Sequence, residues 1–137
     1  MNTNTKTAGM DMKVKLSTLW IFVLFNMIFA DIVGFMNPGA LEDIMTGNVG
    51  IEITQGLLLV FAILLEIPIA LVVLSRVLKY SANRWANIIA GVITILFVIG
   101  GGSLELSYIF FATMEVVGMS LIIWYAWKCV ESIDILT

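Results

Sequence analysis

The run GLLLVFAILLEIPIALVVLSRVL, from Gly56 to Leu78, is the clearest indication of the fold. Until the last few positions it is continuously apolar except for Glu66. A helix needs roughly 20 such residues to cross the hydrocarbon core of a bilayer. The stretch therefore predicts a membrane-spanning helix that carries one carboxylate near its middle.

Three further segments have the same character, and the chain as a whole is 61% hydrophobic and only 12% charged. A soluble domain is usually about one-quarter charged. We therefore predict an all-α fold, a single integral membrane four-helix bundle over residues 13–128, with a disordered segment 1–12 and a tail 129–137. The predicted spans are residues 16–36, 56–78, 85–101 and 107–128.

The charges between these spans separate by sign. All basic residues fall on one side of the predicted membrane: Lys6, Lys13, Lys15, Arg76, Lys79, Arg84 and Lys128. The connections on the other side carry only acids: Glu42, Asp43, Glu52 and Glu105. The positive-inside rule then places both termini in the cytoplasm. Four tryptophans lie toward the basic side and are predicted to anchor in the headgroup layer: Trp20, Trp85, Trp124 and Trp127.

The connection from Asn37 to Gln55 is the longest between two spans. The pair Asn37-Pro38 predicts the start of a short interfacial helix, because Asn caps helices and proline suits the first helical position. We expect this helix to end at Gly47 and Thr54 to cap the next span. The connection could serve as a lid over the bundle or as a plain linker.

The amino-acid composition argues against several kinds of redox and metal site. The chain has one cysteine, Cys129, and no histidine, so it can form neither an internal disulfide nor a C-x-x-C redox pair. Haem held by histidine and zinc held by histidine or clustered cysteines are equally unsupported. No nucleophile motif or phosphate-binding glycine loop is present. We predict no cofactor, no metal and no nucleic-acid partner, and an enzyme has no motif in its favour.

Three carboxylates, those of Asp31, Glu66 and Glu115, lie inside the apolar parts of predicted spans, where no lysine, arginine or histidine accompanies them. Such residues usually face a protein interior or a wet cavity. Glu66 lies ten residues after Gly56 and Glu115 eight after Ser107, which at the helical rise corresponds to depths of roughly 15 and 12 Å. The two glutamates are therefore predicted to meet near the midplane if their helices are neighbours.

Small residues lie about one turn from both glutamates and favour an inward orientation, since they let helices approach closely: Ala62 and Ala70, Ala112 and Gly118. Asn26 and Thr94 add polar groups at a similar depth. The predicted proton- or ligand-binding set is Asn26, Asp31, Glu66, Thr94 and Glu115.

Three roles remain open for these acids. They can be protonated groups that fix helix packing in a structural or accessory subunit. They can exchange protons or a cation during transport, or they can bind a small cationic or amphipathic ligand that enters from the acidic side. Because four short helices enclose little volume, a homodimer is also expected.

Several runs resemble one family of bacterial proteins: Lys13–Phe22 followed by Asn26, Asp31 and Gly34, then Leu65–Pro68, Ser75–Tyr80 and Asn83–Asn87. The family is a group of small four-helix membrane proteins of unknown function, DUF6326, and the resemblance covers Lys13 to Trp127. It implies four spans in the bacterial inner membrane and no established activity; a more distant similarity is to DoxX-like proteins. Small multidrug transporters also carry an intramembrane glutamate, but on the first helix, where this chain has Asn26 and Asp31.

Overall fold

A computed structural model describes the backbone of residues 3–134 and the side chains of Thr7 and residues 10–128. Residues 1–2 and 135–137 and the side chain of Cys129 lie outside that description. Within it the chain is all-α, with helices α1 (Thr3–Phe35), α2 (Ala40–Thr46), α3 (Gln55–Val77), α4 (Tyr80–Gly100) and α5 (Leu106–Asp134). All except α2 are long and apolar enough to cross a membrane.

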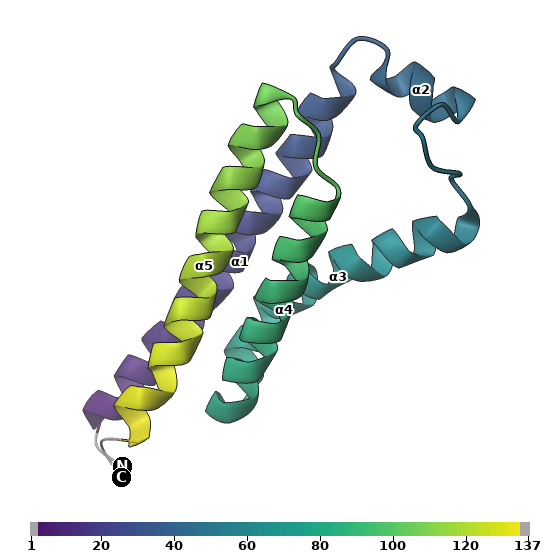
Figure 1. The fold of residues 1–137 in the computed structure, drawn as a ribbon. Helices are drawn as coiled ribbons and strands as arrows, with labels where there is room; N and C mark the ends of the chain where they lie inside the picture. Colours follow the sequence, from purple (N-terminus) through teal and green to yellow (C-terminus); the bar gives the residue numbers. More distant parts are fainter. Residues whose placement is uncertain (1–2, 135–137) are drawn as a thin grey trace.

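Helix α5 lies against both α1 and α4, and α3 packs on α1 and α4 (Figure 1). The buried residues of α3 are Pro68, Leu71 and Ser75, all in its second half. Its first half diverges from the other long helices toward α2 (Figure 1). The packed part of the molecule is therefore built from three helices along their length and from the second half of α3.

The first turns of α1, the α3–α4 turn and the last turns of α5 lie at one end of the molecule (Figure 1). We call this the basic end, because the lysines and arginines of the long helices lie there. The opposite, acidic end holds α2 and the α4–α5 connection. The separation of charges inferred from the sequence thus agrees with the arrangement of the helices.

Helix α1 begins at Thr3, so most of the segment predicted to be disordered is helical. Likewise α4 begins at Tyr80, before the predicted start at Trp85. At the start of α1 and of α4, the hydropathy of the sequence indicates where the apolar part of the helix begins. The helical backbone itself begins earlier, among polar residues. Interactions inside the molecule hold these extensions, since Met12 packs on the core and the Lys13 ammonium lies 4.9 Å from the centre of the Tyr80 ring.

The caps of the connection between α1 and α3 follow the sequence in part. Gly47 ends α2 in the left-handed conformation, with φ of 74°, and the Thr54 hydroxyl accepts a hydrogen bond from the Leu57 amide at 3.2 Å. Both predictions are confirmed. The start of α2 was predicted at Pro38 but lies at Ala40, after Gly39 with φ of 86°.

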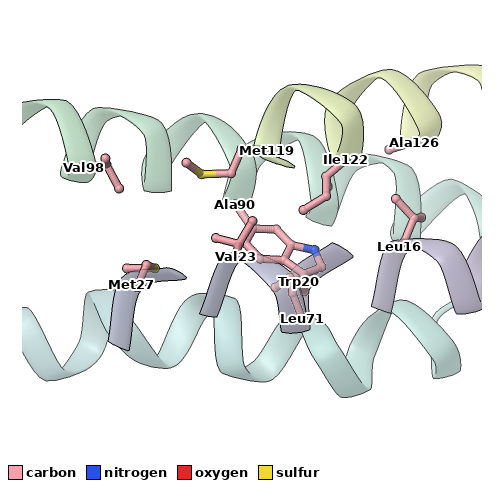
Figure 2. Close-up of a cluster of buried hydrophobic side chains, with 10 residues drawn as sticks. All are labelled: Leu16, Trp20, Val23, Met27, Leu71, Ala90, Val98, Met119, Ile122 and Ala126. Carbon is pink, nitrogen blue, oxygen red and sulfur yellow. The ribbon is translucent and has the colours of Figure 1, made fainter. Parts of the chain in front are cut away.

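The core joins all four long helices (Figure 2). Its buried apolar residues are Leu16, Trp20, Val23 and Met27 of α1, Leu71 of α3, Ala90 and Val98 of α4, and Met119, Ile122 and Ala126 of α5. The α1 residues recur at intervals of three and four and so form one helical face. Trp20 is 0% exposed, so the prediction that it anchors in the headgroup layer is wrong.

Two glycines allow the helices of the core to approach closely. A Cβ atom on Gly118 of α5 would lie 2.9 Å from Cγ2 of Val23 on α1. A Cβ atom on Gly91 of α4 would lie 3.0 Å from Cγ1 of Ile123 on α5. Both distances are shorter than carbon atoms tolerate without movement, so glycine sets the spacing of α5 from both neighbours.

Candidate acidic cavity

A cavity of about 280 Å³ lies between the four long helices, toward the acidic end. Every long helix contributes to its wall: Met27, Ala30 and Asp31 from α1, Phe61 and Leu65 from α3, Phe97 and Val98 from α4, Gly101 just after α4, and Tyr108, Ala112 and Glu115 from α5. Most of this lining is apolar. Its ionisable carboxyl groups are those of Asp31 and Glu115.

Glu115 is the most buried acid of the described residues, with 3% of its surface exposed. It shares a helix face with Tyr108 and Ala112, which precede it by seven and three positions, and this explains why all three line the cavity. Across the cavity, Asp31 is near enough for the two carboxylates to repel each other when both are charged. No lysine or arginine lines the wall, so a cation or a proton would have to supply the missing positive charge.

Neither Asp31 nor Glu115 makes a hydrogen bond to another residue in the described part of the chain. A buried carboxyl that serves packing is normally hydrogen-bonded, because burial of an unpaired polar group costs about 1–3 kcal/mol. Glu115 is such a group, whereas Asp31 is exposed. The unpaired Glu115 carboxyl therefore distinguishes this site from ordinary polar packing.

The structure does not bring Glu66 to this site. Its side chain is exposed, whereas Leu65 and Phe61 of α3 line the cavity and Pro68 is buried. Successive residues of a helix are rotated by about 100°, so Glu66 points about 100° away from Leu65 and nearly opposite to Pro68. The prediction that Glu66 and Glu115 meet required α3 and α5 to be neighbours, but α5 packs on α1 and α4 instead. Glu66 is also turned away from the cavity, because depth along a helix does not fix direction around it.

Asn26 and Thr94 also stand apart from the cavity wall. The Asn26 amide donates to the Phe22 carbonyl of its own helix at 2.8 Å. Thr94 is buried, but its hydroxyl donates to the Ala90 carbonyl one turn back, at 2.8 Å. Both polar groups are hydrogen-bonded within their own helices, and neither lines the cavity with Asp31 and Glu115.

Tyr108 lines the cavity, although it is not among the site residues predicted from the sequence. Its hydroxyl donates a hydrogen bond to the Val98 carbonyl near the end of α4, which holds the ring against Gly101 and Gly102. The oxygen remains able to accept a hydrogen bond. The signal that could have found it is the spacing of Tyr108 and Glu115, two turns apart on one helix face.

A second cavity of about 200 Å³ lies nearer the acidic end. It is lined by Ala30, Asp31, Gly34 and Phe35 of α1, Ala40 and Ile44 of α2, and Ser103, Glu105, Ser107 and Tyr108. Asp31 and Tyr108 thus line both cavities. A hydrogen bond from the Asn37 amide to the Glu105 carboxylate joins the two connections at this end.

A buried polar network, which was not predicted from the sequence, centres on Asn87. The Asn87 Oδ1 atom accepts from Trp20 Nε1 at 2.7 Å and from the Ser75 hydroxyl at 3.0 Å. Its amide donates to the Asn83 carbonyl and side-chain oxygens, both at 2.8 Å. The Asn83 amide donates to the Ser75 carbonyl at 3.0 Å. The network ties α1, α3 and α4 together, and the signal was the pair of asparagines four residues apart.

The basic end is held by further polar contacts between α1 and α3. The Ser17 hydroxyl donates to the Val72 carbonyl at 2.7 Å and accepts from Arg76 Nε at 2.9 Å. The Lys13 ammonium donates to the Leu78 carbonyl at 2.6 Å. These bonds serve carbonyls at the end of α3, so they are structural contacts.

No group of three or more potential metal-ligating side chains comes together within the described residues. The cavity therefore offers two carboxyls and a phenol, which suit a proton, a monovalent cation or an organic ammonium group better than a tightly held transition metal.

Four long apolar helices with large hydrophobic side chains exposed along them indicate a protein whose solvent is lipid. The site that this fold builds is an acidic cavity between its helices. The chain belongs to the family of unknown function DUF6326, whose model matches residues 8–133. No curated protein and no solved structure matches it.

Proposed function

We propose that this protein is a multi-pass protein of the bacterial inner membrane that binds or moves a proton, a cation or a small amphipathic ligand through the cavity between Asp31 and Glu115. The observation that carries the proposal is the burial of Glu115 on a cavity wall that has a second carboxyl and no basic residue. An intramembrane acid in this setting marks a proton or ion pathway more often than a packing contact.

In this proposal each residue has a defined role. Glu115 is the inner binding group, because it is the deeper and more buried carboxyl. Asp31 lies between the inner and outer cavities and passes the proton or cation from one to the other. Tyr108, which also lines both, offers its oxygen as a neutral acceptor. The basic end faces the cytoplasm, with both termini on that side, so entry from the acidic end is entry from outside.

The alternative function is a structural or accessory subunit whose acids only fix helix packing. The Asn87 network shows what a packing role looks like in this protein, because each side chain in it is hydrogen-bonded across helices. The carboxyls of Asp31 and Glu115 lack such partners in the described residues. That contrast favours the cavity function over the structural one.

The test is transport and binding by purified protein in liposomes. Proton flux is followed with trapped pyranine under a valinomycin-clamped potassium gradient, sodium flux with ²²Na⁺, and amphipathic-cation binding with tetraphenylphosphonium. We expect the wild-type protein to support at least one of these signals and Glu115→Gln to reduce it to the level of empty liposomes. Asp31→Asn should reduce it as well.

Glu66→Gln is the matched comparison, because it removes a carboxyl from a span without touching the cavity wall. We expect this variant to keep the wild-type signal, whereas a loss equal to that of Glu115→Gln would return Glu66 to the site. If the wild-type protein gives none of the three signals, or Glu115→Gln keeps the signal, the structural alternative replaces the proposal.

A further inference from the structure

Glu66 is an acid in a membrane span that the cavity does not use. Its side chain is exposed on α3, and no hydrogen bond joins it to the other described residues. A carboxyl that faced hydrocarbon would cost at least roughly 2.5 kcal/mol. Something polar must therefore meet it in the bilayer.

The helix that carries Glu66 is also the one with the least packing inside the molecule. Only 11% of the apolar window of α3 is buried, compared with 22–33% for the other three spans. Its outward face is a stripe of exposed residues at intervals of three and four: Leu59, Ala62, Glu66, Ile69 and Val73. Such a stripe is the seam along which two helices pack, and one polar residue within it sets the register.

We propose that this α3 stripe is a two-fold interface between two copies of the protein. All copies in a membrane have the same orientation, so Glu66 lies at the same depth in each. A two-fold axis along the membrane normal then brings Glu66 to Glu66, where one shared proton lets the two carboxyls hydrogen-bond to each other. Ala62, one turn away, keeps the helices close enough for this contact.

A second copy fits the stripe better than a partner of another kind for two reasons. The face is self-complementary, because a two-fold axis brings Ala62 and Glu66 of one copy to the same depth as Ala62 and Glu66 of the other. None of its residues lines either cavity, so pairing would leave Asp31 and Glu115 undisturbed. The inference is thus independent of the proposed function.

Disulfide trapping in membranes tests the interface. In a Cys129→Ser background, Ala62→Cys and Val73→Cys place thiols on the stripe, and Leu96→Cys, which is 65% exposed on α4, is the matched control. Copper phenanthroline should convert the two stripe variants into disulfide-linked dimers and leave the control monomeric. Equal cross-linking of all three, or linkage of the stripe variants to a different polypeptide, would overturn the proposal.

The carboxyl itself is tested by single-molecule photobleaching of labelled protein in liposomes. Glu66→Leu should weaken dimerisation by about 3- to 30-fold, the range of an interhelical hydrogen bond in a membrane. Glu66→Gln retains paired hydrogen bonds and should dimerise like the wild type. A Glu66→Leu variant that dimerises normally contradicts the role of Glu66, and unchanged proton flux in a monomeric variant keeps this question separate from the cavity.

Discussion

The indole of Trp20 on α1 donates a hydrogen bond to the Asn87 side chain on α4, at 2.7 Å, and both residues are 0% exposed. Helix α3 joins this pair through the Ser75 hydroxyl. Because lipid offers no competing partners, these bonds give the helices a specific rotation that apolar contacts alone define poorly. The network therefore helps to set the faces that α1, α3 and α4 present to the cavity.

Replacing Asn87 by Leu should destabilise the protein by about 2 kcal/mol or more, because it leaves the Trp20 and Ser75 donors buried without an acceptor. Thermal unfolding in detergent, followed by circular dichroism, measures the loss. Asn26→Leu is the control, since that amide bonds only to its own helix, and its effect should stay below about 1 kcal/mol. Similar effects from both variants would contradict a special role for the network.

Gly118→Ala should destabilise the protein by about 1–3 kcal/mol, because the new methyl group would lie 2.9 Å from Val23. Gly34→Ala is the comparison: a Cβ atom there meets nothing within 4 Å. That variant should be neutral or more stable by up to about 1 kcal/mol, since alanine is the better helix former. Equal melting temperatures for the two variants would refute the close approach of α1 and α5.

Glu115→Met should stabilise the fold by about 1 kcal/mol while it abolishes the proposed binding or flux, because it replaces an unpaired buried carboxyl by an apolar side chain of similar length. Thermal unfolding and the liposome measurements are made on the same preparation. A structural acid predicts the reverse, a less stable protein. A lower melting temperature for Glu115→Met would therefore favour the structural alternative.

The orientation of the protein is tested with single cysteines in a Cys129→Ser background. Ser81→Cys places a thiol at the basic end and Glu52→Cys places one at the acidic end; both positions are exposed. In intact bacterial cells a membrane-impermeant maleimide should label Glu52→Cys and leave Ser81→Cys unlabelled. The opposite pattern would place the basic end outside and reverse the direction of entry that we propose.

Part of the candidate site was predictable from residues alone. Glu115 and Asp31 were recognisable as unpaired acids in apolar spans, and the structure places both on one cavity wall. Glu66 satisfied the same criteria and is exposed instead. Tyr108 and Asn87 were assigned no site role, because a tyrosine near a span end and asparagines near a helix start have common surface roles. No feature of the neighbouring sequence distinguishes the buried Glu115 from the exposed Glu66.

The class of structure follows from the residues alone: four long apolar helices, their approximate limits and the separation of basic and acidic ends. These properties depend on the hydropathy and length of each segment and on the charges between segments. They do not depend on how a helix is turned about its axis. The rotation of each helix depends instead on contacts between helices, such as the approach of Gly118 to Val23 and the hydrogen bond between Trp20 and Asn87. That rotation directs Glu115 into a shared cavity and Glu66 away from it, because a step of one residue turns a side chain by about 100°.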